Sequence, residues 1–133
     1  MDFSGLIKTG SEAQRDETVT DKNIASVLGS GGLAVYATPA MIALMERAAF
    51  AVARPFLPEG WSTVGTELNI KHIAASPLGM KVYARAEILG IDGRLLSFRV
   101  EAFDEAGKIG EGTHSRFIVD VAKFLGKLEG KKA

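Results

Sequence analysis

The spacing of hydrophobic positions changes once along this chain, from a helical to a strand-like pattern. Residues 38–54 are apolar on nearly every side, which predicts one helix that is buried rather than lying on the surface. Thr38-Pro39 is typical of a helix start, because threonine can cap free backbone N–H groups and proline has none at the first helical position. Pro55 and Pro58 predict where the helix ends.

Beyond position 60 the apolar residues alternate, as they do in half-buried strands. The segments 80–91, 94–103 and 108–120 predict three consecutive strands, and Asp92-Gly93 is a strong hairpin signal. A weaker alternation at 13–20 indicates an exposed strand. The first long strand is expected to turn one face to the core, with Val64, Thr66, Leu68, Ile70 and His72 on that face.

One helix and an antiparallel meander predict an α+β fold in which the sheet covers one side of the helix. The other side of so apolar a helix also needs a cover, and a second subunit is the simplest source. We expect a single domain over residues 1–133, with 1–12 and 130–133 loose and a flexible loop at 29–32. The pattern at 119–129 fits either a continued strand or a short helix.

Composition narrows the classes of function. The 133 residues include no cysteine, so disulfides, thiolate zinc sites and cysteine nucleophiles are excluded. The formal net charge of zero argues against general nucleic-acid binding. No apolar run is long enough for a membrane span, and the start of the chain lacks the pattern of a secretory signal, so we expect a cytoplasmic protein. Two histidines make a metal site improbable, and we expect no cofactor.

Glu46 is the residue most in need of an explanation, because it lies in the middle of the apolar helix. A desolvated carboxylate is costly unless it is paired, hydrogen-bonded or protonated, and such groups are frequent in active sites. The structural alternative is an ion pair with Arg47, Arg54 or His72.

Three blocks of sequence resemble the fluoroacetyl-CoA thioesterase-like branch of the hot-dog fold, in which a buried helix is wrapped by an antiparallel sheet. They are Tyr-Ala-Thr-Pro-Ala-Met-Ile-Ala-Leu-Met-Glu at 36–46, Val-Gly-Thr-Glu-Leu-Asn-Ile-Lys-His-Ile-Ala-Ala-Ser-Pro-Leu-Gly at 64–79, and Gly-Glu-Gly-Thr-His-Ser-Arg-Phe at 110–117. The resemblance runs from about residue 32 to residue 123. It implies a homodimer with active sites at the subunit interface and an acyl-CoA substrate, with coenzyme A present only as part of that substrate.

The same resemblance implies a catalytic set of Thr38, Glu46 and His72, with the Gly65 backbone helping to shape the acyl site. The fluoroacetate-specific member has bulky phenylalanines before the threonine, whereas this chain has Gly-Ser-Gly-Gly-Leu-Ala-Val-Tyr at 29–36. A general acyl-CoA thioesterase acting on short or medium acyl groups is therefore the implied activity. Leu33 and Tyr36, which belong to this segment, are the expected acyl contacts in addition to Gly65.

These residue types suit thioester hydrolysis, which needs a nucleophile or activated water, a proton acceptor and donors for the oxyanion. Glu46 is the candidate base or nucleophile, while Thr38 would position the attacking group and His72 would orient water and shuttle protons. Eight helical positions separate Thr38 from Glu46, so they lie roughly 80° apart in azimuth and about two turns apart along the axis. They are not expected to touch, although a substrate could bridge them.

Each candidate also has a structural interpretation. Thr38 is a potential helix cap, an inward His72 is more often a satisfied core residue, and Gly65 inside a strand is typical of a bulge or a close backbone approach. We interpret His114 as a structural or interface residue, on the face opposite Ile109, Thr113 and Phe117. A set of strand cations is expected to face solvent, where some could hold CoA phosphates: Lys71, Lys81, Arg85, Arg99 and Arg116.

Three hypotheses follow from the sequence. The leading one is a homodimeric acyl-CoA thioesterase. The second is a non-catalytic module that binds acyl-CoA or another small ligand on the same fold. The third is a structural protein whose polar trio maintains dimer packing.

Overall fold

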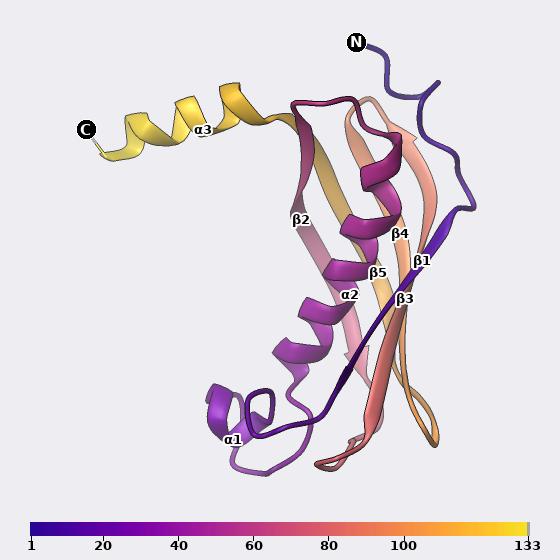
Figure 1. Cartoon of the computed structure of the whole chain (residues 1–133), viewed down its shortest axis with the longest axis vertical. Coiled ribbons are helices and arrows are strands. Elements are labelled where there is room, and N and C mark those ends of the chain that lie inside the picture. Colours follow the sequence, from indigo (N-terminus) through magenta and orange to yellow (C-terminus); the bar gives the residue numbers. More distant parts are fainter. Residues whose placement is uncertain (133) are drawn as a thin grey trace.

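Five antiparallel strands wrap around one long helix in the computed structural model, which describes residues 1–132 (Figure 1). The strand order is β1-β3-β4-β5-β2, so β1 and β2 form the two edges. This arrangement confirms the predicted α+β class. The elements are β1 (Glu12–Thr18), α1 (Ala25–Leu28), α2 (Thr38–Ala53), β2 (Trp61–His72), β3 (Lys81–Asp92), β4 (Leu95–Asp104), β5 (Gly107–Asp120) and α3 (Val121–Glu129), with 3-10 turns at Arg54–Phe56 and Gly130–Lys132.

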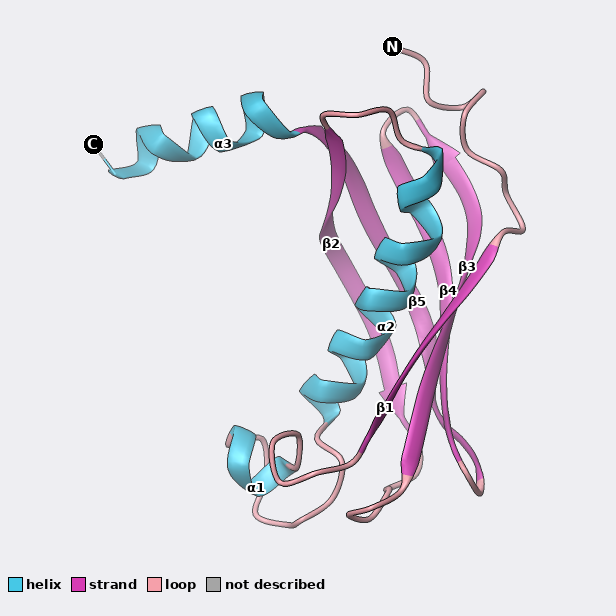
Figure 2. Cartoon of the chain, in the orientation of Figure 1, coloured by secondary structure: helices cyan, strands magenta, loops and turns pink. Residues whose placement is uncertain are grey.

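The core lies between α2 and the concave face of the sheet (Figure 2). The inward positions of β3 and β4 are those that the alternation predicts, and all of them are buried: Val82, Ala84, Ala86, Ile88, Leu96, Phe98, Val100 and Ala102. On the helix, Met41, Leu44, Met45 and Ala48 are completely buried against them. None of the helices in residues 1–132 is long and apolar enough to cross a membrane.

The expected alternation of β2 is wrong at its start, because a β-bulge lies between Gly65 and Glu67. An extra residue in one strand reverses the faces on the two sides of the bulge. Val64 pairs with Phe117 on the outer face of the sheet, whereas Leu68 pairs with His114 on the helix face. Leu68, Ile70 and His72 therefore keep the expected inward direction, and Val64 and Thr66 do not.

The ends of the chain also differ from the expectation of loose tails. Residues 1–11 lack regular strands and helices, but Phe3 and Ile7 are buried, and Phe3 packs edge-on against Trp61 with 4.9 Å between ring centroids. The apolar area gained by burying these side chains explains the order. At the other end the chain becomes a helix, and α3 extends away from the sheet with every residue at least partly exposed (Figure 1). Residue 133 of the predicted tail lies outside the described residues.

Helix α2 is covered by its own sheet on one side only, so a single chain leaves part of it exposed. One stripe faces solvent, formed by Ala43, Glu46, Arg47 and Phe50. The free edge of β2 is also open, and Glu67, Leu68 and Asn69 are exposed there. Apolar groups on this side, such as Phe50 at 36% exposure and Leu68 at 41%, are what a single chain leaves uncovered.

Candidate active site

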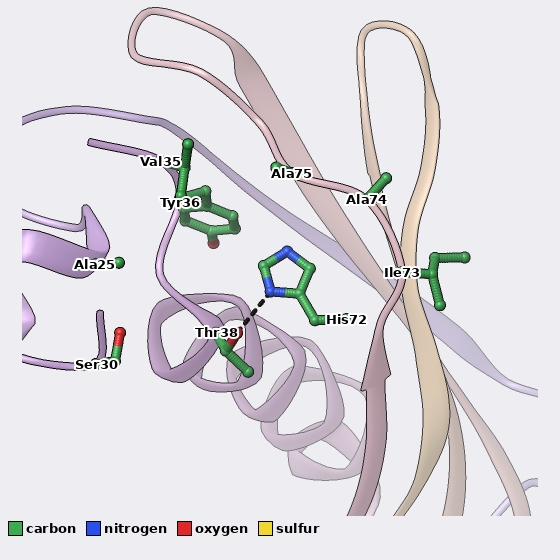
Figure 3. Close-up of a pocket in the computed structure, with 9 residues that line it drawn as sticks. All are labelled: Ala25, Ser30, Val35, Tyr36, Thr38, His72, Ile73, Ala74 and Ala75. Carbon is green, nitrogen blue, oxygen red and sulfur yellow. Dashed lines mark hydrogen bonds between the residues drawn. The ribbon is translucent and has the colours of Figure 1, made fainter. Parts of the chain in front are cut away.

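Thr38 and His72 form the first part of the candidate site, at the N-terminal end of α2 (Figure 3). The helix begins at Thr38 after Ala37, and within the described chain no side chain caps it. The expected capping role of Thr38 is therefore wrong. Its hydroxyl is instead 2.7 Å from Nδ1 of His72, the last residue of β2. This contact leaves Thr38 in place to act on a ligand.

The surroundings of the His72 ring favour its neutral form and leave one ring nitrogen without a hydrogen-bond partner among the described residues. Burial lowers the pKa of His72 below its ordinary value of 6.5, and the nearby backbone of Ala74 only partly opposes this shift. Nε2 is buried and has no hydrogen-bond partner among residues 1–132. A neutral imidazole that accepts the Thr38 hydroxyl proton at Nδ1 carries its own proton on Nε2. Such a ring can donate one hydrogen bond to a bound substrate.

A cavity of about 300 Å³ opens beside this pair. Small side chains form much of its wall, which is lined by Ala25, Ser30, Val35, Tyr36, Thr38, His72, Ile73, Ala74 and Ala75. Tyr36 is among the lining residues, but its hydroxyl is used elsewhere, since it donates to Glu17 Oε2 at 2.5 Å. Leu33 is 70% exposed and lies outside this lining.

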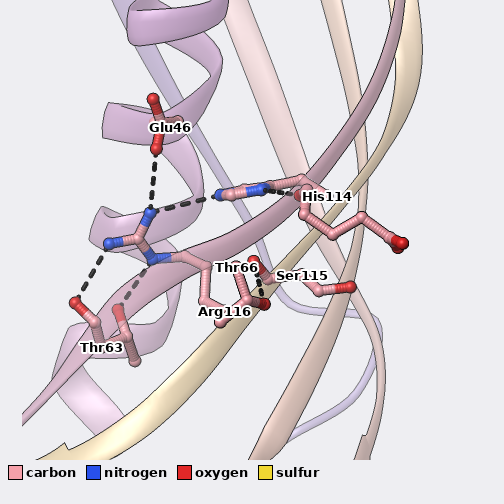
Figure 4. Close-up of polar contacts among 7 residues, drawn as sticks. Glu46, Thr63, Thr66, His114, Ser115 and Arg116 are labelled. Carbon is pink, nitrogen blue, oxygen red and sulfur yellow. Dashed lines mark hydrogen bonds and ion pairs between the residues drawn. The ribbon is translucent and has the colours of Figure 1, made fainter.

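Glu46 lies apart from Thr38 and His72, on the solvent-facing stripe of α2 (Figure 4). Its side chain is 38% exposed in the single chain, so this chain alone does not supply the burial expected for Glu46. None of the expected partners is used: Arg47 pairs with Glu17, and the nearest cation to Glu46 is Arg116, with 3.7 Å between Nη1 and Oε2. The carboxylate is therefore oriented from one side by a buried cation and open to solvent on the other.

Gly65 lies so close to Glu46 that an added side chain would have to displace the carboxylate. A Cβ atom there would lie 2.9 Å from Glu46 Oε2, 3.3 Å from His114 Cε1 and 3.4 Å from Arg116 Nη1. This bears out the structural interpretation of a close backbone approach at a bulge. The backbone of Gly65 meets the carboxylate, whereas the cavity at Thr38 and His72 is lined by other residues.

Within one chain the three polar candidates do not form a single site. Thr38 and His72 line one cavity, and Glu46 lines another with Ala43, Arg47, Phe50 and Arg116. Along the helix, eight residues correspond to about 12 Å between Thr38 and Glu46. The chain therefore carries the parts of an acid–base site at two separate positions on one face.

Sequence reasoning missed Arg116, which was expected to face solvent and is only 7% exposed. His114 faces the same side and is 1% exposed. The sequence did contain a signal for this face, namely the glycine at position 110. In the structure Gly110 faces α2, and an added Cβ there would lie 2.5 Å from Met41 Sδ. Small residues at even positions of β5 mark the face that meets the helix, and His114 and Arg116 share that parity.

The described residues contain no group of three or more His, Asp or Glu side chains placed to hold a metal ion. The available chemistry is that of a hydroxyl, a neutral imidazole, a carboxylate and the first-turn N–H groups of a 16-residue helix, which lack helical carbonyl partners. Such groups can hold an oxyanion and move a proton from water.

Comparisons with known proteins agree with this chemistry. A family model described as fluoroacetyl-CoA-specific thioesterase matches residues 19–122. A fluoroacetyl-CoA thioesterase from Streptantibioticus cattleyicolor is 40% identical over 97 residues, which are 73% of this chain and 70% of that protein. A solved structure of a fluoroacetyl-CoA thioesterase aligns with a TM-score of 0.87 and 33% identity, over 94% of this chain and 97% of the other.

Two further solved structures are similar to this chain. A thioesterase superfamily member from Thermus thermophilus is 32% identical with a TM-score of 0.88, over 95% of this chain and 93% of the other. A hot-dog-like protein from Thermanaerovibrio acidaminovorans is 21% identical with a TM-score of 0.90, over 100% of this chain and 98% of the other, and shows the fold alone.

The fold and these relatives together define a hot-dog thioesterase, an enzyme that hydrolyses acyl-CoA thioesters. Within that class, the chain belongs to the fluoroacetyl-CoA-specific thioesterase family.

Proposed function

We propose that this enzyme hydrolyses short acyl-CoA thioesters at a site completed by two subunits, with Thr38 and His72 from one and Glu46 from the other. The separation of the two halves on one chain carries the proposal, because Thr38 and Glu46 line different cavities. A two-fold axis that sets two α2 helices antiparallel brings Glu46 of one subunit toward the Thr38 end of its partner.

Two open features of the chain support a homodimer of this kind. The β2 edge offers unpaired strand backbone, which favours pairing with another strand. The stripe of α2 that carries Glu46 also exposes Ala43 and Phe50 on the same side. Pairing two β2 edges would continue the sheet across the axis and cover both stripes. The cytoplasmic location expected from the sequence remains a prediction.

The proposed reaction uses the groups in distinct roles. Glu46 accepts a proton from water as the water oxygen bonds to the thioester carbonyl carbon. The resulting oxyanion accepts hydrogen bonds from His72 Nε2 and from the first-turn N–H groups of α2. When the C–S bond breaks, Glu46 returns the proton to the departing CoA sulfur. Thr38 holds the imidazole in the tautomer that this role requires.

The cavity size supports a short acyl group as the substrate. About 300 Å³ is at the small end of the range for ligand sites. Segment 29–36 contains no phenylalanine and contributes Ser30, Val35 and Tyr36 to the wall, so we expect no selection for fluoroacetyl over acetyl or propionyl groups from this segment. We therefore propose a general short-chain specificity.

Hydrolysis of a panel of acyl-CoAs from acetyl to long-chain, followed by thiol release, tests this function. The wild type is expected to be fastest on short chains, and Glu46→Gln is expected to lose about 10²-fold or more in kcat because the amide cannot accept a proton. A wild type no faster than Glu46→Gln on every thioester would contradict the proposal and favour a ligand-binding module.

A further inference from the structure

Arg116 is held in a fixed orientation by contacts on nearly every donor group (Figure 4). Its Nε donates to Thr63 Oγ1 at 2.8 Å, and its Nη2 donates to the Thr63 carbonyl oxygen at 3.1 Å. Nη1 is 3.2 Å from His114 Nε2 and 3.7 Å from Glu46 Oε2. The nitrogen that faces the carboxylate is therefore the one that also contacts His114.

The neighbours of His114 determine where its ring carries a proton. Nδ1 lies 2.8 Å from the carbonyl oxygen of Glu67, which can only accept, so Nδ1 must donate. Nε2 faces an Arg116 N–H group, which can only donate, so Nε2 must accept. Phe98 stacks on the ring at 5.8 Å between centroids and limits its rotation. Only the neutral imidazole with its proton on Nδ1 satisfies both contacts.

We propose that His114 is a positioning residue for thioester hydrolysis: its Nε2 lone pair orients the Arg116 guanidinium, and Arg116 in turn orients Glu46 for proton transfer. The inference rests on the proposed function of Glu46. Glu67, whose carbonyl fixes the tautomer, is the residue that follows the bulge in β2, so the bulge, His114, Arg116 and Glu46 form one connected chain.

Protonation of His114 would break this arrangement. A proton on Nε2 removes the acceptor for Arg116 and places a second cation against the guanidinium. The charged groups that face the ring are Arg116 from β5 and Glu46 from α2. Burial lowers the pKa of His114 below its ordinary value of 6.5, and Arg116 adds to that effect, while Glu46 and the Glu67 carbonyl oppose it. The ring is neutral at pH 7.

Two substitutions separate positioning from packing. His114→Gln keeps an acceptor oxygen near the position of Nε2, whereas His114→Leu keeps the apolar volume and removes the acceptor. We expect His114→Leu to lower kcat about tenfold or more through misplacement of Glu46, with KM changed by less than about twofold. His114→Gln should retain kcat within about threefold of wild type. Thr113→Val, on the outer face of the same strand, is the matched control.

Long-range ¹H–¹⁵N NMR of the wild-type imidazoles supplies a readout that does not depend on turnover. We expect His114 to be protonated at Nδ1 and not at Nε2. A ring protonated at Nε2, a folded His114→Leu variant with undiminished kcat, or His114→Gln as impaired as His114→Leu would each overturn the inference. A wild type inactive on every thioester would instead show that the proposed function is wrong.

Discussion

At the residue scale, Gly65 allows β2 to pass close to the Glu46 carboxylate. Because glycine carries no Cβ, the strand can approach the helix until the backbone meets the carboxylate. Arg116 and His114 converge on the same point from β5. Three residues from two strands, one in β2 and two in β5, thus surround the Glu46 carboxylate.

Gly65→Ala is expected to lower kcat about tenfold while costing less than about 1 kcal/mol in the free energy of unfolding. The added Cβ would lie 2.9 Å from Glu46 Oε2, and the carboxylate is the flexible partner that must move. Kinetics and urea unfolding of the purified variant measure both effects. Gly90→Ala, where an added Cβ meets nothing within 4 Å, is the control. Equal kcat in both variants would contradict the role given to Gly65.

The two histidines predict how stability depends on pH. Burial lowers the pKa of both His72 and His114 from 6.5 in the folded state, so the unfolded chain binds more protons as the pH falls below 6.5. Their contribution to stability is complete above pH 6.5 and is lost as the pH falls through the folded-state pKa values. The melting temperature should therefore fall on acidification below pH 6.5. His114→Gln should weaken this dependence, and an unchanged slope would contradict it.

At the residue scale, the family resemblance placed Thr38 and His72 in one catalytic set, but neither their direct contact nor the burial of Arg116 was predicted. The direction of Arg116 depends on the strand parity of β5, and an arginine on a sheet faces solvent more often than it faces a core. Its burial is possible because Thr63, His114 and Glu46 together satisfy its charge and its donors.

At the element scale, the regular alternation of apolar residues predicted which faces of β3 and β4 are buried. The bulge in β2 was not predicted. Period-2 patterns assign faces correctly only as long as no extra residue enters the strand. The start of α2 was predicted from Thr38-Pro39, but the partner of the threonine was not, because His72 arrives from β2, 34 positions along the chain.

Helix α3 is held to the protein mainly through its first turn. Asp120 caps it by accepting a hydrogen bond from the Lys123 backbone N–H at 3.2 Å. Asp120→Ala is expected to cost the helix about 1 kcal/mol and to speed amide exchange in α3. The global melting temperature of the monomeric unit should change little, since every α3 residue is at least partly exposed. Unchanged exchange in α3 would contradict the capping role.

At the scale of the whole molecule, the fold separates Thr38 and His72 from Glu46, which is the reason for proposing a site shared between two subunits. The helix that carries both Thr38 and Glu46 holds them about 12 Å apart. A sheet that curves around one side of this helix leaves the Glu46 stripe and the β2 edge open. In the proposed homodimer, a symmetric partner would cover both openings and supply the missing group to each site.

The most direct test of this account is complementation between two inactive variants. Thr38→Ala and Glu46→Gln are purified, unfolded together and refolded as a mixture, and hydrolysis of the best acyl-CoA is measured. If each site combines Thr38 and His72 of one subunit with Glu46 of the other, every mixed dimer holds one intact site. Random pairing makes half of the dimers mixed, so activity should return to about one quarter of wild type. A mixture as inactive as the two separate variants would contradict a site shared between subunits.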